Sequence, residues 1–221
     1  MGRPRKDSAT KPVQERLEDA MIKRMLDEPV GAVSVLELTE DTACNRSTFY
    51  YYFNDIDEIA NAALDRAIPY ELPLTIASLM VTYGTEPLSS QRFDELLEQH
   101  AKIDPEQVDM LCLLLNGPNG PLVERKVKDA LSHIYPTIVD ALPNEGARDE
   151  LSLRIIFEYA SSAILGLMAY RGAIGLSVPV ERMIGAVAPE VPRALIGCIN
   201  RATRHIGTKV IDLDSGLPLW Q

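Results

Sequence analysis

Residues 34–53 read SVLELTEDTACNRSTFYYYF, and this stretch decides how the first part of the chain folds. Ser34 and Glu37 have the spacing of a capping box, so we expect a helix to begin directly after Ser34. Val35, Leu36, Leu38 and Thr39 give this helix an apolar side.

A second short helix should follow after a tight turn. Asn45 is a favoured N-cap residue, which predicts a helix that begins at Arg46. Only Ala43 and Cys44 remain for the turn. Two helices joined this closely form a helix-turn-helix, whose second helix can enter the major groove of DNA.

The first turn of the second helix has side chains that suit DNA. Its free backbone N–H groups and helix dipole favour anions such as phosphate. Arg46 has the reach for a guanine edge or a phosphate, while Ser47 and Thr48 are short hydrogen-bond donors. Ser34, at the start of the preceding helix, belongs to the same candidate surface.

Four aromatic residues complete the second helix. Phe49 and Phe53 are four residues apart and so share a face, which we expect to be buried. Tyr50, Tyr51 and Tyr52 cannot all point inward with them, because neighbours on a helix point in different directions. We expect their hydroxyl groups to contact phosphates. The alternative is that the tyrosines are also core residues.

The sequence here resembles the TetR family of bacterial transcriptional regulators. The resemblance lies in the T-F-Y-x-x-F pattern of residues 48–53 and in the acidic helix start at residues 55–59, and it covers about residues 13–66. It implies an all-α protein with an N-terminal three-helix DNA-binding domain. It also implies a larger C-terminal helical domain that binds a small molecule and dimerises.

The chain departs from the family pattern in several places. The turn glycine usual in the family is Ala43 here, and Cys44 replaces the usual small aliphatic residue. The basic residue often found shortly after the phenylalanine is absent, since residues 54–56 are Asn, Asp and Ile, and Tyr52 stands where a histidine is common. The missing basic residue is the departure that bears on one phosphate contact expected from the resemblance.

Four segments are expected: a basic arm at residues 1–12, the DNA-binding domain at 13–66, the effector and dimerisation domain at 67–206, and a tail at 207–221. Strand signals are poor. Periodicity, caps and breakers predict helices over residues 12–27, 55–68, 74–83, 90–101, 104–115, 122–142, 147–173 and 179–205, and a loop over 117–121.

The formal net charge of −10 argues against binding nucleic acid over the whole surface. Residues 1–12 nevertheless hold four basic side chains and one acidic one. Arg3, Arg5 and Lys6 could enter an A·T-rich minor groove as an extended arm. The alternative is a solvated, disordered terminus.

The last two predicted helices, over residues 147–173 and 179–205, are candidates for a four-helix dimer interface, because the first is rich in small and apolar residues. Internal packing is the alternative. The resemblance further implies a pocket for a largely apolar effector, whose binding would release DNA by a population shift. Candidate lining residues, each of which could instead be plain core, are Met80, Tyr83, Phe93, Met110, Leu114, Tyr135, Phe157 and Met168.

Other functional classes have little support. The three histidines are isolated, and the chain has no phosphate-binding glycine loop or serine elbow, so we expect no enzyme, cofactor or metal site. Neither a signal peptide nor a membrane span is evident, and three scattered cysteines fit a cytoplasmic protein. The main rival is a helical dimeric interaction module that has lost DNA binding, because acidic residues flank the aromatic helix.

Overall fold

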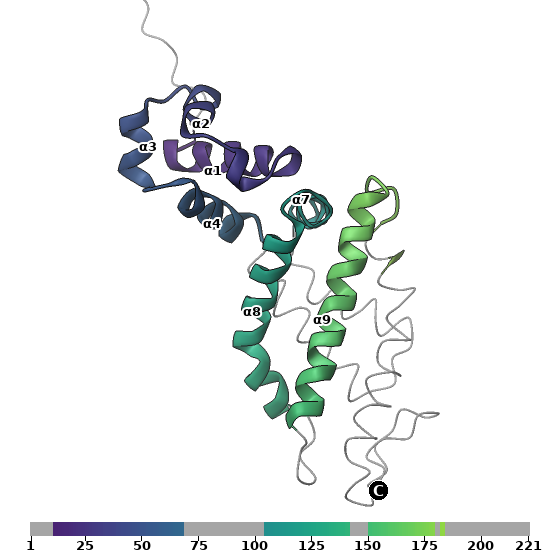
Figure 1. Cartoon of the computed structure of the whole chain (residues 1–221). Coiled ribbons are helices and arrows are strands. Elements are labelled where there is room, and N and C mark those ends of the chain that lie inside the picture. The colour runs from purple at the N-terminus through teal and green to yellow at the C-terminus, as the bar shows by residue number, and fades with distance from the viewer. Residues whose placement is uncertain (1–10, 69–103, 142–149, 180–181, 184–221) are drawn as a thin grey trace, which may run out of the picture. The chain divides into compact units, whose positions relative to one another are not determined.

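The computed structural model describes residues 11–68, 104–141, 150–179 and 182–183 (Figure 1). Every regular element in these ranges is helical, which confirms the all-helical class for them. The chain forms two compact units. Unit 1 contains the described residues through Ala67 together with Gly117–Asn119, and unit 2 contains the other described residues. The predicted helices over 74–83 and 90–101, nearly all of 179–205 and the tail lie outside the described residues.

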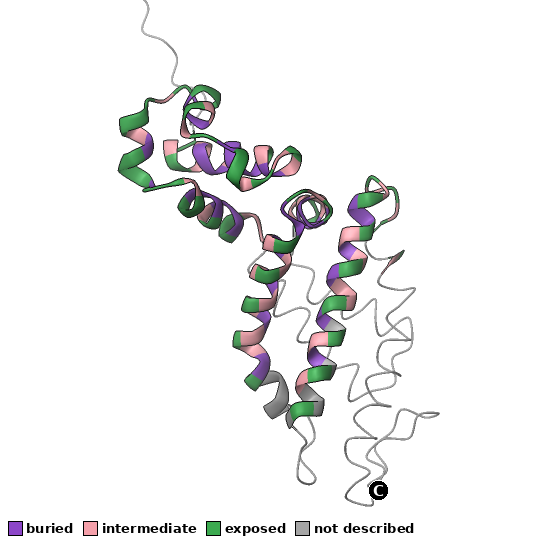
Figure 2. Cartoon of the chain, viewed as in Figure 1, coloured by how far each residue is buried: buried purple, intermediate pink, exposed green. Residues whose placement is uncertain are grey.

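Unit 1 consists of α1 (Val13–Asp27), a 3-10 turn (Val30–Ala32), α2 (Val35–Asp41), α3 (Arg46–Tyr52) and α4 (Ile56–Ala67). Helix α1 packs against α2 and α4, and α2 packs against α3. The buried sides of these helices form one apolar core (Figure 2). Burying each large side chain contributes roughly 1.5–3 kcal/mol. The fully buried members are Leu17, Met21, Met25, Leu38, Phe49, Ile59, Ala63 and Leu64.

Local capping sets the bounds of the two short helices, as predicted. The Ser34 hydroxyl accepts a hydrogen bond from the Glu37 amide at 3.3 Å, and the Glu37 carboxylate accepts one from the Ser34 amide at 2.9 Å. The Asn45 side chain accepts from the Thr48 amide at 2.8 Å. Of the apolar side of α2, Leu38 and Thr39 face the core, whereas Leu36 is 47% exposed.

The turn between α2 and α3 is a Schellman motif built without glycine. The Ala43 amide donates to the Glu40 carbonyl, and the Cys44 amide donates to the Thr39 carbonyl at 3.0 Å. This geometry places Ala43 at φ +50°, in the left-handed region. A Cβ atom in that region is crowded by the following carbonyl, which costs about 1–2 kcal/mol. The turn therefore holds Ala43 in a backbone conformation that is unfavourable for an alanine.

We expect Ala43→Gly to stabilise the protein by about 1 kcal/mol, because glycine enters the left-handed region without that crowding. The side chain of Ala43 is exposed, so no packing is lost. Urea denaturation followed by circular dichroism measures the change. Ala62→Gly, inside α4, is the control and should destabilise by about 1 kcal/mol. Equal losses at both sites would contradict the assignment.

Unit 2 contains α7 (Pro105–Asn116), α8 (Gly120–Ala141) and α9 (Glu150–Ala173). Helix α7 packs against both α8 and α9. The approach to α9 is close, since a Cβ atom on Gly172 would lie 2.2 Å from the Cys112 carbonyl oxygen. The loop between α7 and α8 is shorter than predicted, because α8 begins at Gly120 and Pro121 is accommodated in its first turn.

An ion pair between a buried arginine and a partly exposed aspartate also joins α9 to α7. Arg171 is 6% exposed, and its guanidinium donates to the Asp109 carboxylate and, at 2.8 Å, to the Val178 carbonyl. Burial acts to lower the pKa of Arg171, but the hydrogen bond to Asp109 outweighs it and the pKa is raised. The side chain therefore stays charged. Burial raises the pKa of the Cys112 thiol, and the hydrogen bond from Arg171 offsets this only in part.

Candidate functional site

Helix α3 separates its aromatic residues into a buried and an exposed set. Phe49 is fully buried and Phe53 is 4% exposed, with ring centroids 5.9 Å apart. Tyr50 and Tyr51 are 58% and 82% exposed, and Tyr52 is also exposed. The buried phenylalanine face is confirmed, and the alternative of a tyrosine core is wrong.

All three tyrosines are exposed on α3, and each packs against a neighbouring ring. Tyr51 and Tyr52 meet edge to face with centroids 4.9 Å apart, and Tyr50 meets the buried ring of Phe49 at 5.3 Å. None of the three hydroxyl groups is hydrogen-bonded to another described residue. A tyrosine hydroxyl both donates and accepts, so each of them is available to a polar partner outside the chain.

In the first turn of α3, the polar side chains form more hydrogen bonds with Asn45 than the sequence predicted. The Asn45 side-chain oxygen accepts from the Ser47 hydroxyl at 2.6 Å and from both the amide and the hydroxyl of Thr48 at 2.8 Å. Each hydroxyl has a single proton to donate. Ser47 and Thr48 can therefore accept from a partner as they stand, but they must rotate away from Asn45 in order to donate. Ser34 is similarly occupied, because its hydroxyl donates to Glu37 at 2.7 Å.

Arg46 is the basic side chain of α3. It is exposed, and no described carboxylate pairs with it. Its position at the start of α3 places its positive charge beside the free backbone N–H groups of the first turn. Both features favour an anionic or hydrogen-bond-accepting partner.

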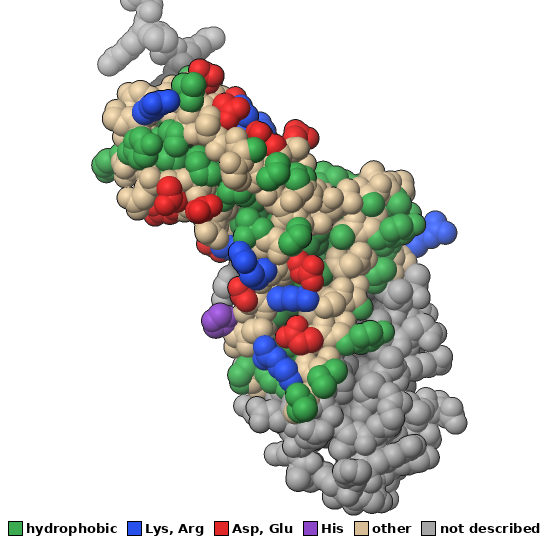
Figure 3. All heavy atoms as spheres, in the orientation of Figure 1, with side chains coloured by type: hydrophobic (Ala, Val, Ile, Leu, Met, Phe, Trp, Pro, Cys, Tyr) green, Lys and Arg blue, Asp and Glu red, His purple; other side chains and the backbone are tan. Residues whose placement is uncertain are grey.

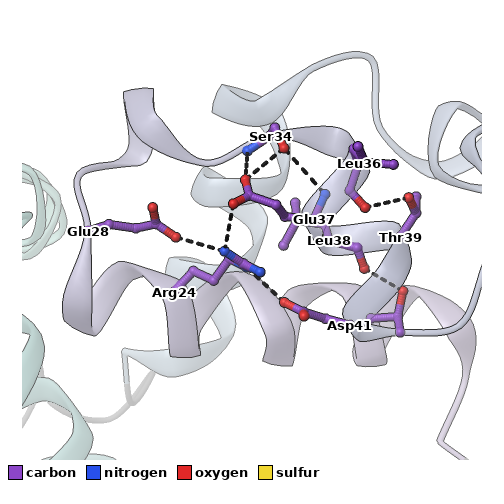
Figure 4. Close-up of polar contacts among 9 residues, drawn as sticks. Arg24, Glu28, Ser34, Leu36, Glu37, Leu38, Thr39 and Asp41 are labelled. Atoms are coloured by element: carbon purple, nitrogen blue, oxygen red, sulfur yellow. Dashed lines mark hydrogen bonds and ion pairs between the residues drawn. The ribbon is translucent and has the colours of Figure 1, made fainter.

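Arg24, unlike Arg46, is paired with several carboxylates (Figure 4). Its guanidinium lies 3.0 Å from Glu28, 3.2 Å from Glu37 and 2.8 Å from Asp41, so it joins the end of α1 to α2. The hydrogen bond to Asp41 raises the pKa of Arg24 further above its ordinary value. The hydrogen bonds from Ser34, with Arg24 nearby, lower the pKa of Glu37, so Glu37 is ionised at neutral pH.

Two further cations of unit 1 are neutralised within the unit. Arg66 pairs with Glu18 at 2.7 Å and with Asp19, and Lys11 pairs with Asp19 at 2.8 Å. Residues 11–67 contain six basic and twelve acidic side chains, so few positive charges remain for an outside anion. Arg46 is the one that lies on the aromatic helix.

Acidic side chains lie on both sides of this surface. Figure 3 shows hydrophobic side chains gathered over α3, with acidic side chains on the neighbouring parts of unit 1. These acidic residues are exposed, so their field reaches any partner that approaches α3. They belong to α2 and to the start of α4: Glu40, Asp41, Asp55, Asp57 and Glu58.

The predicted effector residues lie partly in unit 2 and partly outside the described ranges. Leu114, Tyr135, Phe157 and Met168 are buried, and Met110 is half-buried. Tyr135 and Phe157 meet edge to face at 5.0 Å, and the Arg154 guanidinium lies 4.9 Å from the Tyr135 centroid. Arg154 was not foreseen, because its partners become neighbours only when α8 and α9 pack. Met80, Tyr83 and Phe93, and also Arg3, Arg5 and Lys6, lie outside the described residues.

Comparison of the chain with protein-family models gave no match, and comparison with curated proteins gave no significant match. Within the described ranges, no cluster of three or more His, Cys, Asp or Glu side chains could hold a metal ion. No helix in those ranges is both long and apolar enough to cross a bilayer.

Proposed function

We propose that this protein is a ligand-responsive transcriptional regulator that binds double-stranded DNA as a homodimer, in the manner of the TetR-like proteins that residues 48–59 resemble. The observation that carries the proposal is helix α3. It is a short, capped helix that buries Phe49 and presents Arg46 and three tyrosines to solvent. Such a helix can enter the major groove, with Arg46 at a base edge or phosphate and the tyrosines at the backbone.

The acidic side chains around α3 determine which contacts can contribute to DNA affinity. Since half of the six basic side chains of residues 11–67 are paired with carboxylates of the same unit, the described residues can neutralise few phosphates. Affinity then depends on hydrogen bonds from Tyr50 and Tyr51, on the backbone N–H groups of α3 and on the basic residues 1–12. The dependence of affinity on salt reports the number of phosphates neutralised, so it should be shallow, with a slope of about −2 to −4 per α3-containing subunit.

The test is selection of duplexes from a randomised DNA pool by the full-length protein, followed by fluorescence anisotropy on the enriched sequence over a salt series. The proposal expects enrichment of a palindrome, since two subunits related by a two-fold axis read two half-sites. A pool that shows no enrichment would favour the rival function, a protein-interaction module whose acidic flanks face a basic partner.

Helix α9 supports the homodimer. Its exposed side includes Leu151 at 69%, Ile155 at 58% and Tyr159 at 63%, which are spaced four residues apart and so form one apolar stripe. The same side continues through the exposed residues Ser162 and Gly166, which are small enough to let a second helix approach. A self-complementary helix face of this kind suits a two-fold interface.

Ile155→Glu is expected to convert the dimer to a monomer, because a charge buried at the centre of the stripe has no partner. Sedimentation velocity at a fixed concentration measures the change. Arg125→Glu is the control, since Arg125 is an exposed residue of α8 outside the stripe and should leave the sedimentation coefficient unchanged. A variant at Ile155 that sediments as the parent does would remove α9 from the interface.

The proposed effector is largely apolar, and the rings of Tyr135 and Phe157, with Arg154 nearby, are the proposed contacts. Effector binding would favour a conformer that holds the two α3 helices at the wrong spacing for DNA, so the protein acts as a repressor. Calorimetric titration with and without the selected duplex tests this coupling. An effector that binds equally well in both cases would contradict it.

A further inference from the structure

The side chain of Asn119 caps the C-terminal end of α1, although Asn119 lies about ninety residues later in the chain. Its side chain is 6% exposed, and its amide nitrogen donates to the Met25 carbonyl at 2.7 Å and to the Glu28 carbonyl at 2.9 Å. Its oxygen accepts from the Val30 amide at 2.9 Å. Both protons of the amide and its oxygen are therefore used within unit 1.

The sequence after α1 creates the need for this side chain. A helical continuation would satisfy the Met25 carbonyl with the amide of residue 29, but that residue is Pro29 and has no N–H. The carbonyl is therefore left without its usual donor at the helix end. Asn119 supplies the missing donor and fixes the following turn through Glu28 and Val30.

The residues that flank Asn119 belong to unit 2. Gly117–Asn119 counts with unit 1 by its contacts, while Asn116 ends α7 and Gly120 begins α8. The start of α8 lies very close to the end of α7, since a Cβ atom on Gly120 would lie 2.3 Å from the Leu115 carbonyl oxygen. The packing of α8 against α7 therefore constrains the end of the loop that follows Asn119.

We propose that Asn119 is a positioning residue that couples the end of α1 to the packing of unit 2. When α7 and α8 hold the loop in place, the Asn119 amide caps α1 and orders residues 25–30. When their packing loosens, the cap is withdrawn and that end of α1 frays. The consequence for DNA affinity rests on the proposed function, but the coupling itself does not.

Hydrogen–deuterium exchange of the full-length chain tests the coupling without DNA. Asn119→Ala should speed exchange in peptides that cover residues 25–33 by about tenfold or more, because the buried Met25 carbonyl and the partly buried Glu28 carbonyl and Val30 amide lose their partner. Asn119→Asp keeps the acceptor for Val30 but loses both donors, so it should speed exchange as well. Asn116→Ala, an exposed asparagine three residues earlier, is the matched control and should leave exchange unchanged. Unchanged exchange in Asn119→Ala would overturn the proposal.

A double-mutant cycle separates coupling from a purely local cap. Leu131→Ala removes a fully buried side chain of α8 in unit 2, and Val127→Ala provides a milder change of the same kind if the first variant does not fold. Either change should speed exchange at residues 25–33 when Asn119 is present and add nothing when it is alanine. An equal effect in both backgrounds would show that Asn119 has a structural role only. Since no DNA is used, failure of the DNA-binding proposal leaves this result intact.

Discussion

Arg46→Glu is expected to lower the affinity for the selected DNA duplex by about 100-fold or more. A good bidentate contact between arginine and a base contributes about 1–3 kcal/mol, and reversing the charge adds repulsion from nearby phosphates. Few other cations can compensate, because Arg24 and Arg66 are already paired with carboxylates. Fluorescence anisotropy at two salt concentrations gives the change, and a thermal melt checks that the variant is folded.

Lys23→Glu is the matched control for this substitution. Lys23 is exposed, has no ion pair with a described residue, and lies on α1 rather than on α3. The change in net charge is identical, so a loss that arises only from general repulsion should appear equally in both variants. A much larger loss at Arg46 assigns the effect to α3. If the glutamate variant at Arg46 binds as the parent does, α3 is not the DNA-reading helix.

Arg46→Lys distinguishes the two roles open to this side chain. Lysine keeps the charge but cannot form the two parallel hydrogen bonds that arginine makes with a guanine edge. If Arg46 contacts a phosphate, the variant should bind within a few-fold of the parent on every sequence. If it reads a base, affinity should fall mainly on the selected duplex, and repeated selection should show relaxed preference at one position of each half-site.

The features of unit 1 that follow from local sequence were predictable. The Ser34–Glu37 capping box and the Asn45 cap depend on residues three apart, so the pattern itself fixes the helix starts. The split between the phenylalanine and tyrosine faces of α3 follows from helical periodicity in the same way. Local rules also gave the turn, but they could not give the left-handed conformation of Ala43, because the sequence lacks the glycine that normally signals it.

Features that depend on distant residues were not predictable. Arg24 is neutralised by carboxylates from the end of α1 and from α2, and nothing in the spacing of Glu28, Glu37 and Asp41 shows that one guanidinium reaches all three. The role of Asn119 is a stronger case. A run rich in glycine and proline predicts a loop, but only the folded chain shows that its amide caps a helix ninety residues earlier.

Phe49→Ala is expected to destabilise the protein by about 3–5 kcal/mol. The Phe49 side chain is fully buried, and its ring contacts the rings of both Phe53 and Tyr50. Truncation therefore removes a whole ring and leaves a cavity. Small domains have total stabilities of about 5–15 kcal/mol, so this loss is a large part of what unit 1 can have. Urea denaturation with circular dichroism measures the loss, and hydrogen exchange in residues 35–53 locates it.

Tyr51→Ala provides the contrast on the same helix. Tyr51 is 82% exposed, so its removal should change stability by less than about 0.5 kcal/mol. If the tyrosines contact DNA, the same change should still weaken binding by several-fold, because a phosphate contact is lost. The two substitutions therefore separate the buried and exposed sides of α3: the first mainly lowers stability, and the second weakens DNA binding without lowering stability. A Tyr51 variant that loses stability but keeps full affinity would reverse this assignment and place the tyrosine in the core.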